Sequence, residues 1–498
     1  MISYRNQKCN GYMTVYLALT VSVIISLCLA LIEGCRYRGI QLETECVMDI
    51  GMDSILAEYH RELLKQYNLF AIDCSYGTPY ASTEFTGKHL LEYMNRNFSL
   101  DDVFLEKLLY RDFFAIHAED VEATKAAFLT DEAGENFRRA AVSAVEDDVG
   151  LELLQQIMDW LNTIESEGLE EQDVAGQKQQ IDAQIQEYDG KKTPTGETIH
   201  IENPTAGLEE KRNSGILKLV IKEENISGRS LISQDLIEER AKQGEINHGN
   251  IPLRQQEKWE DLEEKFLFHE YILRYLGRYG EEKEQSPLWY QTEYVIAGKE
   301  NDTENLRTIV NRIFIIREAA NTMYLLSSEE KYAIAEALGE VLAAAMMVPE
   351  IAGLFTATLI LGWAFAESVY DVKTILSGGK IPLLKEDATW HYGLSSALQD
   401  SETDADAGNA NDIFSMGYED YLRTFLMLCD ETTTIYRTMN IVELDIRNTP
   451  GNSAFRLDAC ITEIGLNVKV KSKYGYSFEI ERQKSYIGSL EAIENTGN

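Results

Sequence analysis

The clearest feature of the hydrophobic pattern is an apolar run from Gly11 to Ile32 that contains no charged residue. At about 1.5 Å of rise per residue, a helix of this length spans roughly 33 Å, close to the hydrocarbon thickness of a bilayer. Helices of soluble proteins rarely stay apolar on every face over so many residues. The run therefore predicts a transmembrane helix over residues 11–32, and a buried helix of a soluble protein is the alternative.

After this run the pattern changes to that of an amphipathic helix. Residues 34–67 contain no proline. Apolar residues recur along one helical face, at Met48, Met52, Ile55, Tyr59, Leu63 and Tyr67. We therefore expect one continuous helix from the bilayer to about Lys65, with residues 33–67 as a stalk. Residues 68–74 then have the pattern of a strand that ends in a turn.

Charged residues flank the apolar run on both sides, at Arg5, Lys8, Arg36 and Arg38. The positive-inside bias is weak, but a short tail over residues 1–10 is easily retained in the cytoplasm. We therefore expect this tail inside the cell and the bulk of the chain outside. A cleaved signal peptide is one alternative, although no small-x-small cleavage site follows the run. Lipidation of Cys35 is another, although Glu33 stands where small residues are required.

Strand and helix patterns are mixed over residues 68–188, which predicts an α+β domain. Residues 112–124 alternate as a strand does, and residues 137–164 have helical spacing. His117 lies within the strand pattern. We expect this histidine to be partly buried rather than a metal ligand.

The chain turns polar before helical patterns return. Residues 177–188 predict a short exposed helix, and residues 189–215, which contain prolines and glycines, predict a linker or insertion. Helical spacing then dominates residues 216–400, which we expect to form a helical bundle domain. His269 shares the apolar face of one of these helices and is expected to line the core.

The most regular helices fall in the middle of the bundle domain. Asp302 or Thr303 is expected to cap one of them, and Ser327 with Glu330 forms a capping box for the next. A third helix over residues 351–376 has a long uncharged section. This section is a candidate second membrane span, but its short length and its many small residues favour the centre of a bundle.

The C-terminal part predicts a helix and a hairpin. A helix is expected over residues 418–434, and two alternating segments around Val468 and Phe478 predict a β-hairpin. We expect residues 413–498 to pack on the helical bundle. Residues 401–412 contain closely spaced aspartates but lack the glycine and glutamate of an EF-hand, so an exposed acidic loop is expected and a calcium site is the alternative.

The charge of the chain limits which molecules we expect it to bind. The chain has 46 basic and 83 acidic residues and a net charge of −37. Such a field repels nucleic acids and anionic lipid head groups, so neither is expected as a partner. The seven cysteines show no CxxC motif, which favours buried thiols over a disulfide scaffold. A bond between Cys429 and Cys460 stays open.

Catalytic motifs are missing from the sequence. It contains no G-x-S-x-G, no G-x-x-x-x-G-K-[ST], no G-x-G-x-x-G and no H-E-x-x-H pattern. The seven histidines stand apart along the chain. We therefore expect no enzymatic activity, no cofactor and no metal, with a membrane-anchored enzyme or a ligand-binding ectodomain as the alternative.

Two parts of the sequence resemble known families. Gly11 at the start of an apolar run, a long amphipathic helix and Gln-Tyr-Asn-Leu-Phe-Ala-Ile-Asp at residues 66–73 resemble the TadE and TadG type of pseudopilin-like proteins from bacterial tight-adherence (Tad/Flp) pilus loci. Those families carry a basic residue before the glycine and a glutamate about five residues later. Asn10 and Val15 or Tyr16 stand at those positions here, which argues against processing by a prepilin peptidase.

Three further segments, residues 293–299, 363–372 and 417–426, resemble an uncharacterised bacterial family of membrane-anchored proteins associated with the same loci. The resemblance implies a non-catalytic cell-envelope component of pseudopilin-like or pilus-associated type. Its expected partners are the lipid bilayer and other pilus-system membrane subunits or like helices.

The apolar run also contains small residues at a spacing of four, at Ser22, Ser26 and Ala30. This spacing predicts a contact face between membrane helices. The complete expectation is a mostly helical α+β protein, in which a transmembrane helix continues into a stalk helix and an extracytoplasmic head that contains a helical bundle and short β-hairpins.

Overall fold

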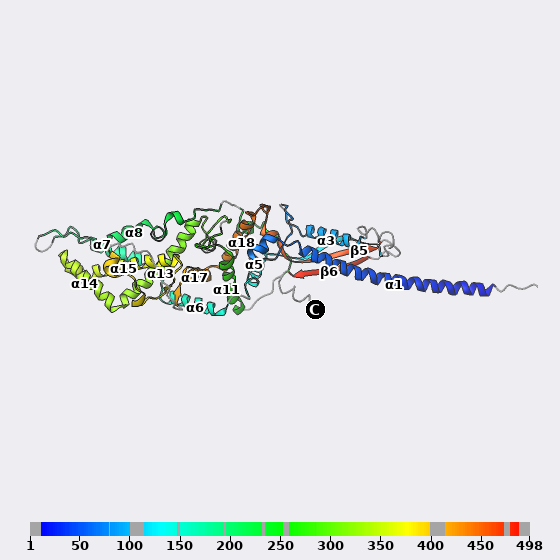
Figure 1. Cartoon of the computed structure of the whole chain (residues 1–498), viewed down its shortest axis with the longest axis horizontal. Coiled ribbons are helices and arrows are strands. Elements are labelled where there is room, and N and C mark those ends of the chain that lie inside the picture. The colour runs from blue at the N-terminus through cyan, green and yellow to red at the C-terminus, as the bar shows by residue number, and fades with distance from the viewer. Residues whose placement is uncertain are drawn as a thin grey trace, which may run out of the picture. The chain divides into compact units, whose positions relative to one another are not determined.

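The computed structural model describes residues 11–78, 80–99, 114–146, 150–192, 196–231, 235–251, 258–283, 285–398, 414–472 and 479–487. Within these ranges the fold is α+β and mostly helical, with one four-stranded and one two-stranded sheet (Figure 1). The predicted fold class is therefore confirmed. The N-terminal tail and the acidic loop at residues 401–412, with its open calcium alternative, lie outside the described residues.

The chain forms two compact units. The first consists of described residues within 1–140, 245–254 and 454–498, and the second of those within 141–244 and 255–453. The segment expected to be a linker or an insertion, residues 189–215, therefore lies inside the second unit. The C-terminal hairpin belongs to the first unit instead of the helical bundle.

The first unit is built on one long helix. Its elements are α1 (Tyr12–Leu56), α2 (Arg61–Tyr67), β1 (Ile72–Asp73), α3 (Thr83–Phe98), β2 (Ile116–Phe128), η5 (Leu457–Ala459), β5 (Cys460–Ser472) and β6 (Glu479–Ile487). A further helix, α5 (Asp131–Ser143), follows β2 and extends past the boundary between the units. The apolar run and most of the amphipathic segment form α1 without interruption.

The stalk helix ends earlier than expected. After Leu56 the chain leaves the helix, and His60 caps α2 by accepting a hydrogen bond from the backbone N–H of Leu63 at 3.2 Å. Tyr59 pairs with Ile72 in an isolated antiparallel bridge. The expected continuous helix to about Lys65 is therefore wrong, because this pairing holds the backbone in an extended conformation between the two helices.

The sheet of the first unit is entirely antiparallel. Strand β5 is central: it pairs with β2 on one edge, and with β1 and β6 on the other. The strand expected at residues 112–124 is found at Ile116–Phe128, and the expected C-terminal hairpin is β5 and β6. The strand expected at residues 68–74 shortens to two residues, because Asn68 adopts a left-handed conformation at the end of α2.

The core of the first unit lies between the sheet and two helices. Leu466, Val468 and Val470 of β5 belong to one buried cluster with Met48 and Met52 of α1 and with Leu90 and Met94 of α3. The expectation that the hairpin packs on the helical bundle is thus wrong. Since β5 pairs with β2 along almost its whole length, its apolar face is placed against α1 and α3.

Gly51 of α1 lies against α3, and its replacement tests how tightly the two helices pack. A Cβ atom at Gly51 would lie 2.6 Å from Leu90 Cδ1 and 3.4 Å from Met94 Cγ. We expect Gly51→Leu to lower the free energy of unfolding of the first unit by about 1–3 kcal/mol, because a well-packed core resists added methylenes. Denaturant unfolding of the full chain in detergent micelles measures this effect.

Gly34 of the same helix provides the matched control, since a Cβ atom there would meet nothing within 4 Å. Gly34→Leu should leave stability unchanged or raise it slightly through helix propensity. Equal stability of the two leucine variants would contradict the tight packing of α1 on α3.

The regular elements of the second unit are almost all helices. Its elements are α6 (Leu151–Ser166), α7 (Val174–Gln186), α8 (Ala206–Ser214), α9 (Ile216–Val220), η2 (Glu223–Asn225), α10 (Ile237–Gln243), α11 (Lys258–Tyr275), α12 (Gln291–Ala297), α13 (Asp302–Ser327), α14 (Glu329–Ala345), η3 (Pro349–Ile351), α15 (Ala352–Leu376), β3 (Ile381–Pro382), η4 (Asp387–Thr389), α16 (Leu394–Leu398), β4 (Ser415–Met416), α17 (Tyr418–Leu428) and α18 (Glu431–Arg447). Strands β3 and β4 form the two-stranded sheet. The helix expected over residues 137–164 is present as α5 and α6, and the one expected over residues 418–434 as α17 and the start of α18.

Helix α15 forms the centre of the second unit and contacts α7, α13 and α14 (Figure 1). It is long and apolar enough to cross a membrane, but 72% of its apolar window is buried inside the unit. The interpretation of residues 351–376 as a central bundle helix is therefore confirmed. Helix α7 was expected to be exposed, but Lys178 and Ile185 are buried because α7 packs on α15.

The helix caps differ from the expected ones by one residue. Asn301 caps α13 by accepting a hydrogen bond from the N–H of Glu304 at 2.9 Å, and Ser328 caps α14. Asp302, expected as a cap, is instead buried and accepts hydrogen bonds from the backbone N–H groups of Trp289 and Tyr290. Its carboxylate thereby fixes the chain that precedes α12.

Candidate functional site

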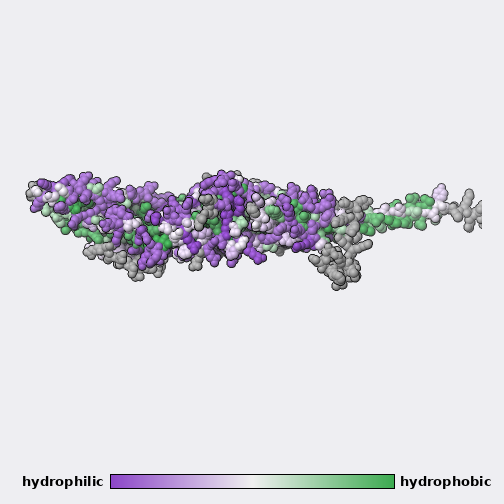
Figure 2. Space-filling model, turned by 90° about the horizontal axis from the view of Figure 1, so that it is seen from above, coloured by the Kyte–Doolittle hydropathy of each residue, from purple (hydrophilic) through white to green (hydrophobic). Residues whose placement is uncertain are grey.

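Among the described residues of the first unit, the first part of α1 forms the largest exposed apolar surface. Its large apolar side chains, from Tyr12 to Ile32, are between 44% and 89% exposed. Figure 2 shows this section as a hydrophobic rod. Monomeric soluble proteins rarely expose so large a continuous apolar surface. The helix is long and apolar enough to cross a membrane, which the sequence predicted.

Three hydroxyl groups within this section are satisfied by the helix itself. Thr14 donates to the carbonyl of Gly11 at 2.8 Å, Thr20 to that of Tyr16 at 3.0 Å, and Ser26 to that of Val23 at 2.9 Å. Such bonds remove the cost of placing a hydroxyl group in hydrocarbon. These three side chains are therefore compatible with a lipid environment.

The predicted helix-contact residues lie on this exposed surface. Ser22, Ser26 and Ala30 are all exposed, so they are accessible to a neighbouring helix. Their role in helix association stays a prediction.

The apolar surface ends one helical turn before the core of the first unit begins. Arg36 is buried, pairs with Glu33 at 3.3 Å, and donates to the hydroxyl oxygen of Ser472 at the end of β5 and to the carbonyl of Phe114. Ser472 in turn donates to the same carbonyl at 2.8 Å. The guanidinium group thus ties α1 to the sheet directly beside the apolar section.

Each of the seven histidines has its own partner among the described residues. The ring of His60 contacts that of Phe455 at a tilt of 44°, and the ring of His391 stacks on that of Tyr370. The other contacts are His89 with Glu58, His117 with Glu119, His200 with Asp189, His248 with Asp131 and His269 with Met427. Among the described residues, no group of three or more His, Cys, Asp and Glu side chains is placed to hold a metal ion.

Two predicted histidine environments can be compared with the structure. His117 is about one-third exposed, as expected for a residue in a half-buried strand. His269 is buried, and burial, with a smaller contribution from the Lys265 ammonium group, lowers its pKa to about 3. It is therefore a neutral core residue, which confirms the prediction.

The cysteines of the open disulfide alternative are both free thiols. Cys460 is buried and Cys429 is partly buried, and neither is bonded. Burial raises the pKa of Cys429, so its thiol is protonated and unreactive at neutral pH.

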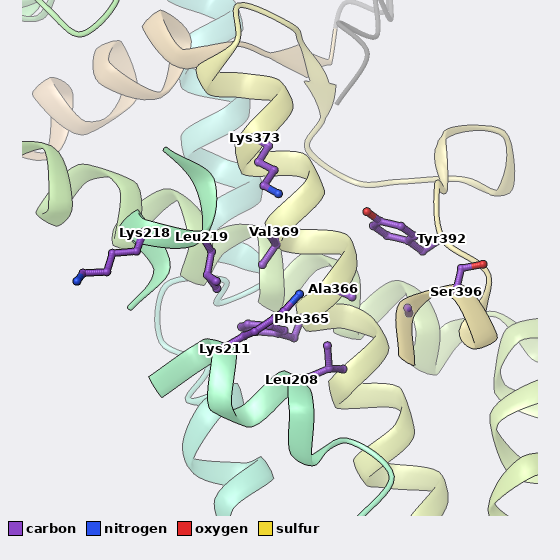
Figure 3. Close-up of a pocket in the computed structure, with 11 residues that line it drawn as sticks. Leu208, Lys211, Lys218, Leu219, Phe365, Ala366, Val369, Lys373, Tyr392 and Ser396 are labelled. Carbon is purple, nitrogen blue, oxygen red and sulfur yellow. The ribbon is translucent and has the colours of Figure 1, made fainter. Parts of the chain in front are cut away.

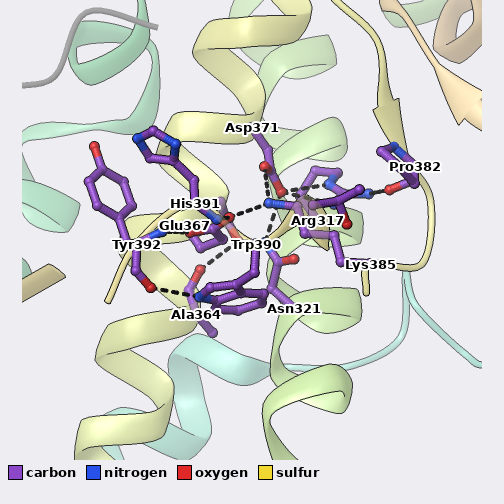
Figure 4. A network of polar contacts seen from close by, with 12 residues as sticks. Arg317, Asn321, Ala364, Glu367, Asp371, Pro382, Lys385, Trp390, His391 and Tyr392 are labelled. Carbon is purple, nitrogen blue, oxygen red and sulfur yellow. Dashed lines mark hydrogen bonds and ion pairs between the residues drawn. The ribbon is translucent and has the colours of Figure 1, made fainter. Parts of the chain in front are cut away.

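The second unit contains a fully buried network of four charged side chains (Figure 4). Arg317 pairs with Asp371 at 2.8 Å, and Lys385 pairs with both Asp371 and Glu367. Burial disfavours ionisation of Asp371, but the cations of Lys385 and Arg317 outweigh it and hold its pKa below the usual value. Two cations and two carboxylates make the network neutral.

This network joins three segments of the second unit. Arg317 of α13 donates to the carbonyls of Pro382 and Leu383, each at 2.8 Å, while Glu367 of α15 accepts from the backbone N–H groups of residues 391 and 392. The segment between α15 and α16 is thereby fastened to both helices. With no exposed surface, these side chains are suited to structural support rather than to chemistry on a substrate.

A second buried cluster centres on Glu293 of α12. Tyr418 donates its hydroxyl proton to Glu293 Oε1 at 2.6 Å, and the N–H of Tyr279 donates to the same oxygen at 2.9 Å. Glu293 Oε2 has no hydrogen-bond partner among the described residues. Burial raises the pKa of Glu293 to about 7 against these hydrogen bonds. The carboxyl group is therefore poised between its protonated and charged forms near neutral pH.

The fold and these sites define a class: a mostly helical α+β protein with an exposed apolar N-terminal helix and a second unit stabilised by buried polar clusters. A model of a family of unknown function (DUF5702) matches residues 194–472, more than half of the 498 residues, so the chain belongs to that family. No curated protein and no solved structure matches the chain significantly.

Proposed function

We propose that the protein is a non-catalytic, membrane-anchored component of the cell envelope, of pseudopilin-like or pilus-associated type, that acts in a tight-adherence pilus system. The N-terminal tail lies in the cytoplasm, the apolar section of α1 spans the membrane, and the bulk of the chain lies outside. The lipid bilayer and like helices of other membrane subunits are its partners.

The continuity of α1 is the observation that carries this proposal. The same helix supplies the exposed apolar section and, from Ile40 onward, the side chains that pack on the antiparallel sheet. A catalytic domain needs only a flexible tether to a membrane. A helix shared between anchor and core instead suits a subunit that is positioned by packing against neighbouring helices.

The arrangement of the second unit supports the absence of catalysis. Three of its pockets are lined in part by Lys211, Arg229 and Arg307, and among their described lining residues they contain no histidine and a single acidic residue, Glu223. Histidine and carboxylate side chains are the commonest general acids and bases, although lysine and tyrosine also serve in this role. The alternative of a ligand-binding ectodomain stays compatible with these pockets.

Disulfide crosslinking in native membranes tests the proposed helix association. In a background in which the exposed Cys28, Cys35 and Cys46 are replaced by serine, single cysteines at Ser22, Ser26 and Ala30 are expected to give crosslinked dimers. These positions allow close approach of two helices because their side chains are small.

Cysteines at Ile24 and Leu31 serve as matched controls, since they lie on the opposite helical face at about 100° per residue. They are expected to crosslink much less. Crosslinking at none of the five positions, or equal crosslinking at all of them, would overturn the proposed contact face.

Genes for a secretion ATPase and a prepilin peptidase beside this gene are expected, and their absence from the genomes that carry the family would contradict the pilus assignment.

A further inference from the structure

Helix α14 of the second unit presents apolar side chains to solvent. Ile334 is 46% exposed and Val341 is 63% exposed. Ala337 and Ala344 are exposed as well. These four residues follow one another at spacings of three and four, so they lie on one side of the helix, which we call the outer face. The outer face is therefore a continuous apolar strip on the surface of the second unit.

The inner face of α14 consists of small residues. Helix α14 packs chiefly on α15 (Figure 1), and Ala335, Gly339 and Ala343 are buried. A Cβ atom at Gly339 would lie 2.9 Å from a backbone nitrogen of α15, so the two helices lie close together. Leu338 and Leu342 are only partly buried. A surface helix normally directs its larger apolar side chains toward the core. The exposed isoleucine and valine of the outer face are therefore available to a partner outside the unit.

Acidic side chains follow one edge of the outer face. Glu329, Glu336 and Glu340 are exposed, and their spacings of seven and four residues place them in one row. None of the three pairs with a basic side chain in the part of the chain that the structure describes. The single lysine of α14, Lys331, has only 15% of its side chain exposed and pairs with Asp387. The apolar strip is therefore bordered by negative charge that no described cation balances.

This charge distinguishes between three kinds of partner. A second copy of the chain would bring the same acidic row to the contact, where like charges oppose association. An anionic membrane surface is repelled in the same way. A helix with an apolar face and basic side chains beside it complements both the strip and the row.

We propose that the outer face of α14 is a docking surface for a basic amphipathic helix of another protein. The apolar side chains of that helix pack on Ile334 and Val341. Its lysine or arginine side chains pair with Glu336 and Glu340. This surface belongs to the second unit alone, so the proposal does not depend on the membrane contacts of α1.

A synthetic helical peptide as long as α14, with leucines on one face and lysines on the other, tests this surface. The full chain is placed in phosphatidylcholine nanodiscs, and empty nanodiscs report binding of the peptide to lipid. We expect fluorescence anisotropy of the labelled peptide to show saturable binding at one site. A scrambled peptide of equal charge without an apolar face should bind more weakly. It measures the nonspecific attraction of a chain with a net charge of −37.

Charge reversal tests the acidic row. The double variant Glu336→Lys, Glu340→Lys should weaken binding of the lysine peptide by about tenfold or more, because repulsion replaces attraction. It should also bind a peptide in which glutamate replaces every lysine, which the native chain should not bind. Both positions are exposed, and a gain of binding cannot result from a loss of folding.

Val341→Ser tests the apolar strip. It should weaken binding of the lysine peptide by about fivefold, because less apolar surface is removed from water. Leu428→Ser on α17 is the matched control, since Leu428 is a 42% exposed apolar residue of the same unit. It should leave the affinity unchanged. Equal effects of the two serine variants, equal binding of the ordered and scrambled peptides, or an unchanged peptide preference after charge reversal would refute the docking surface.

Photocrosslinking in native membranes tests the identity of the occupant. With benzoylphenylalanine in place of Val341, we expect a crosslink to a segment of another protein. Mass spectrometry of the product should show that this segment has an apolar helical face with lysine or arginine beside it. A product that joins two copies of this chain, or no protein product at all, would contradict the proposal.

Discussion

Replacing Arg317 by methionine should lower the free energy of unfolding of the second unit by about 3–5 kcal/mol, the cost of breaking a buried ion pair. Arg317 and Asp371 have no exposed side-chain surface, so water cannot take the place of the lost guanidinium group. The carbonyls of Pro382 and Leu383 would lose their donor at the same time. Denaturant unfolding followed by tryptophan fluorescence measures the loss, since the ammonium group of Lys385 lies 5.4 Å from the ring of Trp390, which in turn contacts Trp363.

Two further variants separate the charge effect from lost packing. Arg312→Met on the same helix removes a partly exposed pair with Glu170 and should cost only about 1 kcal/mol. Combining Arg317→Met with Asp371→Asn should cost less than the sum of the single changes, because Lys385 and Glu367 then balance each other. Strict additivity of the two changes would show that the network does not act as a coupled unit.

The native protein should become less stable as the pH rises from about 4.5 to about 7. Replacing Glu293 by glutamine should abolish this loss. Burial raises the pKa of Glu293 from 4.5 to about 7 in the folded chain. Between these values the folded state binds more protons than the unfolded state, so stability falls with rising pH. The contribution is complete below pH 4.5 and lost above about pH 7, and it amounts to about 3 kcal/mol.

Glutamine imitates the protonated carboxyl group, and its amide oxygen can still accept the bonds from Tyr418 and from the N–H of Tyr279. The variant should therefore gain stability relative to the native chain at pH 8 and show little difference at pH 4.5. Nearby Asp302 also has a pKa raised by burial, so only the difference between the two proteins isolates Glu293. Parallel stability curves from pH 4.5 to 8 would contradict the raised pKa.

Elements with strong local patterns could be predicted from the sequence. The apolar start of α1, the central helix α15 and the hairpin of β5 and β6 follow from hydrophobic spacing alone. The break after Leu56 could not be predicted, because it depends on the pairing of Tyr59 with Ile72. The position of the hairpin likewise depends on β2, which is far away in the sequence.

The buried clusters left a partial signal in the sequence. The segments at residues 293–299, 363–372 and 417–426, which carry the family resemblance, contain Glu293, Glu367, Asp371 and Tyr418. Glu367 and Asp371 are spaced four residues apart directly after an uncharged section of α15, so two carboxylates on an inner helical face indicate buried cations nearby. Which cations these are, Arg317 and Lys385, depends on contacts between distant segments and could not be read from the pattern.

The pocket of the second unit that is lined by Lys211 and Lys373 (Figure 3) left no comparable signal in the sequence. Lys211 and Lys373 lie on different helices far apart in the sequence, and each is an ordinary surface lysine when its own helix is considered alone. Only the packing of α8 and α9 beside α15 brings them to one pocket.

Because α1 is unbroken, its length also fixes how the sheet of the first unit is rotated about the helix axis, relative to the apolar section. Because the helix has no joint between Ile32 and Arg36, a bilayer or helical neighbour that holds the apolar section fixes the direction in which the sheet of the first unit faces. Each residue added to or removed from this turn would rotate that sheet by about 100° around the helix axis and move it by about 1.5 Å along it. The number of residues between Ile32 and Arg36 therefore determines the orientation of the sheet of the first unit, just as the side chains on its surface do.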